Sequence, residues 1–142
     1  MNIFTLILNK KVDLIEQHIT TLIDEGCTIS GDLKAKNYVR IDGVIEGNVM
    51  VEHGLILGEK GIIKGDVKTQ DVIIYGTIKG NVQAKQLEIK TTGRIKGSIT
   101  TQKIQIDMGA TYNGVLSMFV EDAKNEILQT RQINEVDTAV LL

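Results

Sequence analysis

Histidine and cysteine, which are frequent catalytic residues and metal ligands, are few in this 142-residue chain. The histidines are His18 and His53, and the one cysteine is Cys27. A structural zinc site ordinarily needs four such ligands, so this set predicts no ordinary structural zinc site, and we predict no metal-binding residues. Cys27 follows a glycine and is typical of a small apolar filler, and His53, in Val-Glu-His-Gly, is typical of a solvated turn. We therefore predict no catalytic residue, no cofactor and no internal disulfide.

Signatures of phosphate binding are also missing from the sequence. There is no Gly-Lys dipeptide, which a P-loop requires, and no Gly-x-Gly of the dinucleotide-binding kind. The formal net charge is −2, from 16 basic and 18 acidic residues, and gives no reason to expect a polyanion as partner. We predict that the protein binds neither nucleotide nor nucleic acid.

Glycine, by contrast, is used systematically, because it marks an internal repeat. Six similar segments follow one another: TISGDL (28–33), VIEGNV (44–49), IIKGDV (62–67), TIKGNV (77–82), RIKGSI (94–99) and TYNGVL (111–116). Their glycines are Gly31, Gly47, Gly65, Gly80, Gly97 and Gly114, at steps of 15 to 18 residues. A fixed repeat of this length is the signature of a solenoid or a similar repeat architecture.

Apolar residues keep the same register as the glycines. Two positions before each glycine stand Ile29, Ile45, Ile63, Ile78, Ile95 and Tyr112, and two after it stand Leu33, Val49, Val67, Val82, Ile99 and Leu116. A further alternating stretch in each unit has as inward candidates Ile41, Leu57, Ile74, Ile89 and Ile106. Alternation with a period of two, rich in β-branched residues, predicts strands.

A unit of about 17 residues is too small to bury its own apolar face, so the units must stack. Stacked strands lie about 4.8 Å apart, which would align equivalent side chains in continuous columns. The sequence therefore predicts an all-β fold over residues 20–119, a parallel β-helix (solenoid) of about six coils. Short segments outside the repeat, 1–19 and 120–142, flank this predicted β-helix domain.

Two columns on the outside of the predicted solenoid carry charge. Lys64, Lys79 and Lys96 directly precede repeat glycines and would stack on one another. They are interpreted either as a solvated face or as a basic ridge for an acidic partner or tail. Directly after the glycines, Asp32, Asn48, Asp66 and Asn81 alternate, which would keep carboxylates off adjacent coils.

The N-terminal segment 1–19 has a helical stripe and an apolar start. One interpretation is a cap on the open end of the solenoid. The other is an interfacial membrane anchor, in which lysines meet anionic lipid beside buried apolar side chains. The membrane-targeting residues would be Ile3, Phe4, Leu6, Ile7, Leu8, Lys10 and Lys11. Residues 120–142 are compatible with a frayed tail or with a partner-binding segment.

The C-terminal coil predicts a surface for self-assembly. A solenoid leaves unpaired backbone groups at both ends, and such edges template association unless they are capped. The last coil offers the apolar side chains of Tyr112, Leu116, Met118 and Phe119. Contacts between like ends would give a non-polar filament and contacts between unlike ends a polar one, and the sequence leaves both open.

The recurrent I-x-G-[DN]-V core, the stretch Y-V-R-I-D-G-V-I-E-G-N-V (38–49) and the coil length resemble bactofilins, bacterial polymer-forming cytoskeletal proteins. The resemblance implies a right-handed β-helix that forms a homopolymer, a non-polar filament assembled without nucleotide. It also implies a scaffold in the bacterial cytoplasm, peripheral on the inner membrane, with membrane lipid and cell-wall-associated proteins as partners. The chain would then be no enzyme.

Two enzymatic alternatives also use β-helices. A left-handed, hexapeptide-type acyltransferase needs apolar-glycine hexads three times per coil, whereas here the paired glycines occur once per coil. A carbohydrate-active β-helix ordinarily has larger coils and protruding loops that carry paired carboxylates.

Overall fold

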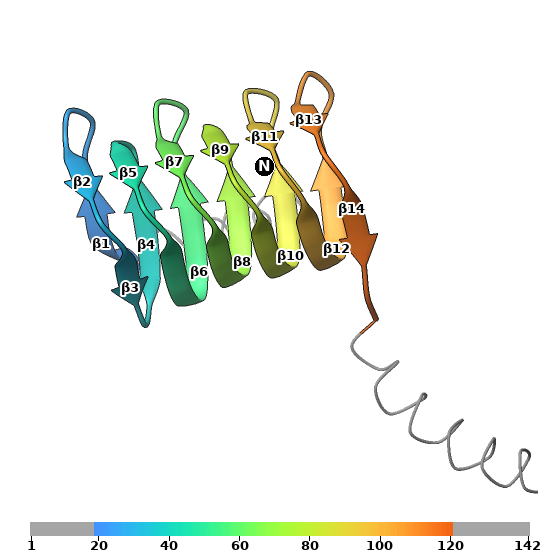
Figure 1. Ribbon diagram of the computed structural model, residues 1–142, viewed down its shortest axis with the longest axis horizontal. Coiled ribbons are helices and arrows are strands. Elements are labelled where there is room, and N and C mark those ends of the chain that lie inside the picture. The colour runs from blue at the N-terminus through green and yellow to red at the C-terminus, as the bar shows by residue number, and fades with distance from the viewer. Residues whose placement is uncertain (1–18, 121–142) are drawn as a thin grey trace, which may run out of the picture.

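The computed structural model describes residues 19–120, and Figure 1 shows them as a stack of coils. All 14 elements of the described chain are β-strands, and every pair of neighbouring strands is parallel. This confirms the predicted parallel β-solenoid of about six turns. The predicted membrane-targeting residues and segment 121–142 lie outside the described residues.

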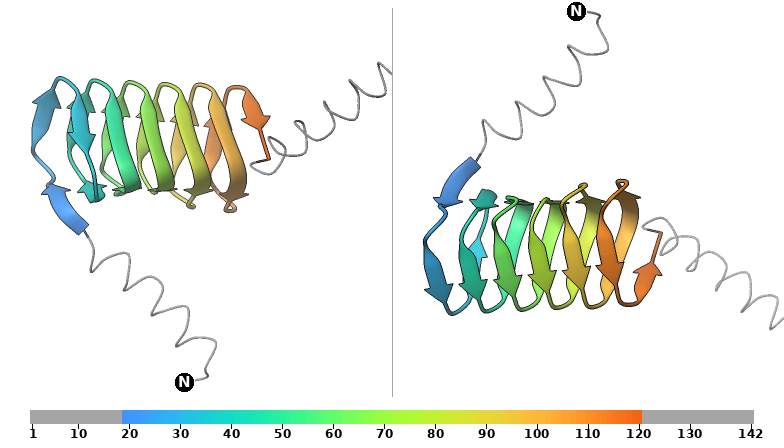
Figure 2. Two further views of the ribbon diagram at one scale, coloured as in Figure 1. Left: turned by 90° about the horizontal axis from the view of Figure 1, so that it is seen from below. Right: turned by 90° about the horizontal axis from the view of Figure 1, so that it is seen from above.

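The strands form two sheets that share one core. Sheet A contains β1 (Ile19–Ile23), β3 (Leu33–Ala35), β4 (Tyr38–Ile41), β6 (Val49–Leu57), β8 (Val67–Ile74), β10 (Val82–Ile89), β12 (Ile99–Ile106) and β14 (Leu116–Met118). Sheet B contains β2 (Thr28–Ser30), β5 (Val44–Glu46), β7 (Ile62–Lys64), β9 (Thr77–Lys79), β11 (Arg94–Lys96) and β13 (Thr111–Asn113). In the central coils, a long strand of sheet A is followed by a short strand of sheet B (Figure 2).

The core consists of the columns that the sequence predicts. Ile45, Ile63 and Ile78 are fully buried in one column, each paired with the next through β5, β7 and β9. The second set of predicted inward residues is fully buried as well, at Ile41, Leu57, Ile74 and Ile89. Each interior side chain packs mainly on its equivalents one coil away. It therefore becomes exposed only where the neighbouring coil is missing, which is the case at the two ends of the described solenoid.

Glycine is required at the repeat position because the backbones of successive coils touch there. At Gly97, φ is +145°, a conformation that residues with a Cβ rarely adopt. A Cβ on Gly97 would also lie 2.6 Å from the carbonyl carbon of Gly80 on the preceding coil and still closer to its oxygen. No other residue type fits this corner without separating the coils.

The column of Asp and Asn side chains beside these glycines forms a hydrogen-bonded ladder. The backbone N–H of Asn48 donates to Oδ1 of Asp32 (2.8 Å), and that of Asp66 donates to Oδ1 of Asn48 (3.0 Å). The N–H of Asn81 donates to Asp66 (3.0 Å) and that of Ser98 to Asn81 (3.1 Å). The alternation seen in the sequence thus joins coils as well as separating like charges.

Replacing Asn81 with alanine should lower the free energy of unfolding by about 1–2 kcal/mol. The substitution leaves the N–H and the hydroxyl of Ser98 without the acceptor that they share, at 3.1 and 2.8 Å. Urea unfolding followed by circular dichroism measures the change. The matched control is Gln83→Ala, an exposed side chain on the outer face of β10, which should change stability by less than about 0.5 kcal/mol. Equal losses in the two variants would contradict the ladder.

One coil departs from the regular register. The pairing of β6 with β8 shifts between Val51 and Gly54, so β6 accommodates an additional residue at its bend. His53 lies in this bulge, where its Nδ1 contacts the carbonyl oxygen of Lys36 and its ring lies 5.9 Å from that of Tyr38. The longest repeat unit therefore differs from the others by a local bulge at the bend.

Candidate interface at the ends of the solenoid

The C-terminal end of the solenoid is a step one strand high. β14 pairs with Ile99–Thr101, the first part of β12. Within residues 19–120, no strand pairs with the outer edge of the second part of β12, Lys103–Ile106. Unpaired N–H and C=O groups of this edge, and the edge of β14 above it, can therefore accept strands from another molecule.

The side chains at this step are apolar and exposed. Three of the four residues predicted for the polymer interface are open to solvent: Leu116 is 39% exposed, Met118 56% and Phe119 40%. Tyr112, the fourth, is half-buried and packs against the core. The structure thus places all four on the terminal coil, in β13, in β14 and directly after it.

The same end also exposes apolar residues that the sequence pattern does not single out. Ile106, expected to point inward, is 46% exposed because no further strand of the described chain covers its column. Met108, at the turn before β13, is 93% exposed, and Val115 is 69% exposed. The missing neighbour distinguishes Ile106 from the buried Ile89 with which it pairs. A repeat pattern cannot show this difference, because it treats equivalent positions alike.

The sequence shows why the apolar repeat ends shortly after β14. Leu116 pairs with Ile99, so continuing this register would place Glu121 in the column of Ile104. That column points into the core, and Ile104 packs against it. Burying an unpaired carboxylate is strongly unfavourable, so the apolar repeat ends here.

The N-terminal end shows the opposite step. β1 covers Tyr38–Ile41 of β4, whereas β3 pairs with β6 and, within residues 19–120, has no strand on its other side. The interior side chains of Ile29, Leu33 and Ala35 are only partly buried there. Each end of the described solenoid therefore has a covered half and an open half.

Tyr112 brings a polar atom to the apolar terminal coil. Within residues 19–120 its hydroxyl oxygen is buried without a hydrogen-bond partner. Desolvation raises the pKa of Tyr112, although the nearby backbone of Ile99 lowers it in part. The hydroxyl therefore stays neutral at physiological pH, and the terminal coil carries no charge at this position.

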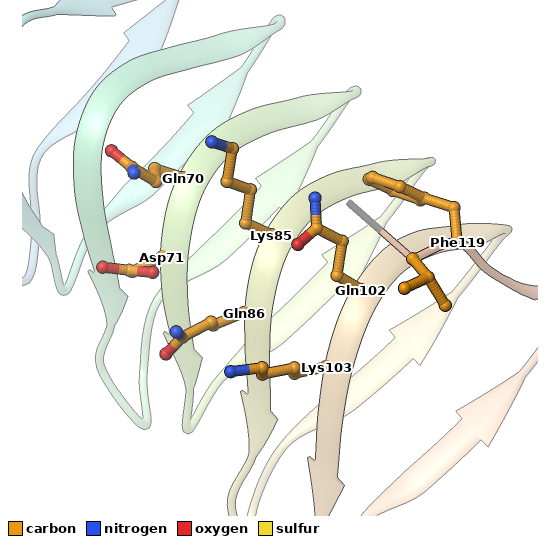
Figure 3. A pocket seen from close by; sticks show the side chains of 8 residues that line it. Gln70, Asp71, Lys85, Gln86, Gln102, Lys103 and Phe119 are labelled. Atoms are coloured by element: carbon orange, nitrogen blue, oxygen red, sulfur yellow. The ribbon is translucent and has the colours of Figure 1, made fainter. Parts of the chain in front are cut away.

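A shallow groove of about 330 Å³ follows the bend of sheet A and ends beside Phe119. Figure 3 shows its side chains arranged in two parallel rows along successive coils. It is lined by Gln70, Asp71, Lys85, Gln86, Gln102, Lys103, Phe119 and Val120. Apolar side chains line only its C-terminal end, where Phe119 and Val120 lie.

The cysteine and the histidine of the described chain lie in different elements. Cys27 is an exposed thiol in the turn after β1, and His53 lies in the bulge of β6. Among residues 19–120, no group of three or more histidine, cysteine, aspartate or glutamate side chains could hold a metal ion. That part of the chain also has no helix of the length and apolarity needed to cross a bilayer. What the described surface does offer is its two open ends.

Fold and ends together define a class of protein: a β-solenoid with open strand edges at both ends of residues 19–120 and apolar side chains exposed at the C-terminal one. Residues 21–117 match the family model of bactofilin, described as polymer-forming cytoskeletal. The chain therefore belongs to the bactofilin family, a structural cytoskeletal family.

Curated relatives and solved structures agree with this assignment. BacO of Myxococcus xanthus is 29% identical over 103 residues, covering 72% of this chain and 82% of BacO. BacP of the same organism is 28% identical over 99 residues, covering 69% of this chain but only 41% of BacP.

Among solved structures, this chain is similar to the Thermus thermophilus bactofilin in double helical filaments, with 30% identity and a TM-score of 0.64. That similarity covers 68% of this chain and 99% of the other. The cytoskeletal bactofilin BacA, determined by solid-state NMR, has 31% identity and a TM-score of 0.64, covering 69% of this chain and 94% of BacA.

Proposed function

We propose that this protein polymerises end to end through its terminal coils, without nucleotide, into non-polar filaments. In the bacterial cytoplasm these filaments would scaffold membrane or cell-envelope proteins. Residues 20–119 would be the polymerisation domain, flanked by the N-terminal segment 1–19 and the tail 120–142. The observation that carries the proposal is the apolar step at the C-terminal end, where an open strand edge lies beside exposed Leu116, Met118 and Phe119.

The shape of the step supports contacts between like ends. A two-fold axis through the step would place β14 of each copy on the open edge Lys103–Ile106 of the other. Each copy would then fill the step of its partner. The Asp/Asn ladder favours the same arrangement. The ladder reaches Ser98, and the next residue in its column is Val115. In a head-to-tail filament, the backbone N–H of Asp32 in the following copy would need an acceptor at this position, and the valine side chain has none. A head-to-tail junction would interrupt the ladder.

Assembly should not depend on nucleotide. Purified protein in buffer treated with apyrase is expected to form filaments at the same critical concentration as protein with added ATP or GTP. Sedimentation at several protein concentrations, with negative-stain electron microscopy of the pellets, measures this. A polymer that appears only after nucleotide is added would refute this part of the proposal.

Membrane association would reside in residues 1–11. The proposal is that Ile3, Phe4, Leu6, Ile7 and Leu8 enter the interface while Lys10 and Lys11 meet anionic headgroups, with polymerisation adding many weak anchors together. Filaments should float with anionic vesicles in a density gradient, and filaments lacking residues 1–11 should stay at the bottom. A second variant, Lys10→Ser with Lys11→Ser, keeps the apolar residues and removes the two charges. Its flotation should be weaker and should not depend on lipid charge. Equal flotation of truncated and full-length filaments would exclude this anchor.

A further inference from the structure

Three lysines form a row along the outer face of sheet B. Strand pairing places Lys64 beside Lys79 and Lys79 beside Lys96, and all three side chains are exposed. Neighbouring strands lie about 4.8 Å apart, so three ammonium groups follow one another along the axis of the solenoid. We call Lys64, Lys79 and Lys96 the lysine row. Figure 1 shows its strands, β7, β9 and β11, side by side.

None of the three lysines of the row forms an ion pair in the described chain, although Glu46 lies opposite Lys64 on the neighbouring strand β5. Some cations elsewhere on the solenoid have carboxylate partners: Lys60 lies 3.1 Å from Glu25, and Lys90 lies 2.9 Å from Glu88. Within residues 19–120, no carboxylate is in ion-pair range of the three ammonium groups of the row. Like charges on directly paired strands repel one another, so the row costs stability unless an anion neutralises it.

The acidic excess of the chain lies in the residues after the solenoid. Residues 121–142 contain five carboxylates and two cations, a net charge of −3, whereas residues 19–120 have a net charge of +1. The carboxylates are those of Glu121, Asp122, Glu126, Glu135 and Asp137. The net negative and the net positive charge of this protein thus lie in different parts of one chain.

We propose that residues 121–142 bind through their carboxylates to the lysine row of the same molecule. The described chain ends at Val120, and 22 further residues can extend about 70 Å, more than the roughly 30 Å length of six stacked coils. Every part of the row is therefore within reach. Because the tail is covalently attached, its effective concentration at the row is of the order of millimolar, and weak ion pairs suffice.

A single polypeptide fits this surface better than a broad anionic one. The row is one residue wide, and Glu46 precedes it in the same column of sheet B. Asp66 lies two residues from Lys64, at the adjoining corner, where its Oδ1 accepts the N–H of Asn81. A planar anionic surface would approach these carboxylates together with the lysines, whereas one segment can follow the row alone.

The experiment measures lysine acetylation by mass spectrometry in the full chain and in a chain ending at Val120. Only the neutral amine reacts, so nearby carboxylates slow acetylation by covering the lysines and by favouring their charged form. At 20 mM salt, Lys79 and Lys96 should react at least threefold more slowly in the full chain. The difference should disappear at 0.5 M salt. Lys34 and Lys68, exposed on the outer face of sheet A, are internal controls and should react equally in both chains.

A third protein separates charge from simple steric cover. In it, all five carboxylates of residues 121–142 are replaced by their amides, and Lys79 should react as fast as in the truncated chain. Equal rates for Lys79 in the full and truncated chains would overturn the proposal, as would protection that survives the amide substitutions. Protection that increases with protein concentration would assign the tail to a neighbouring copy and would overturn binding within one molecule.

Vesicles of anionic lipid, added to the same assay, test the other source of negative charge. If the tail occupies the row, vesicles should not slow acetylation of Lys79 in the full chain. Vesicles that protect Lys79 equally in the full and truncated chains would show that a membrane surface takes this site, and the proposal would be wrong.

Discussion

Replacing Phe119 with arginine is expected to convert filaments into short, soluble rods. Phe119 is 40% exposed, follows β14 directly and lies where the groove of sheet A meets the C-terminal step. In the proposed like-to-like contact, the new guanidinium would be buried against the apolar terminal coil of the partner. An unpaired buried charge costs about 3 kcal/mol or more, which weakens each junction more than a hundredfold.

Sedimentation and negative-stain microscopy measure the loss of filaments, and circular dichroism checks that the β-solenoid remains folded. The control is Met50→Glu, because Met50 is similarly exposed (45%) but lies on the outer face of β6, between the two ends, where a carboxylate beside Lys34 and Lys68 adds no like-charge repulsion. Its filaments should be unchanged in number and length. Abundant filaments of Phe119→Arg, or equal losses in both variants, would place the polymer contact elsewhere.

Replacing Gly97 with alanine should unfold most of the protein, with a loss of about 4 kcal/mol or more in the free energy of unfolding. Two effects add at this position. Alanine is strained at φ +145°, at a cost of about 1–3 kcal/mol. Its Cβ would also lie 2.6 Å from the carbonyl carbon of Gly80, so the two coils would have to separate. Such a loss is a large part of the total stability of a small domain.

Gly31→Ala isolates the second effect. Gly31 has a similar φ of +136° but lies on the first coil, where an added Cβ would have no atom within 4 Å. This variant should lose only the cost of strain, about 1–3 kcal/mol. Urea unfolding of both variants in the Phe119→Arg background excludes any contribution from filament disassembly. Equal destabilisation of the two variants would show that close coil contact is not the reason for glycine at this corner.

The sequence by itself determined the solenoid, its core and the role of its glycines. In a parallel stack in register, every coil repeats the local conformation of the one before, so structural equivalence appears directly as a period in the sequence. The period alone therefore assigns residues such as Ile45, Ile63 and Ile78 to one column, and all three are fully buried. The same register also identified which residues of the C-terminal coil are apolar and equivalent to core residues of the earlier coils.

Only the tertiary structure decided what happens where the repeat is interrupted. The half-turn step, the exposure of Ile106 and Met108, and the bulge at His53 depend on which strand is absent or lengthened at one place. The direction of the Asp/Asn ladder also depends on the three-dimensional arrangement, because sequence alternation does not show which group donates. A periodic pattern reports what the coils have in common, whereas the proposed interface lies where a coil of residues 19–120 lacks its neighbour.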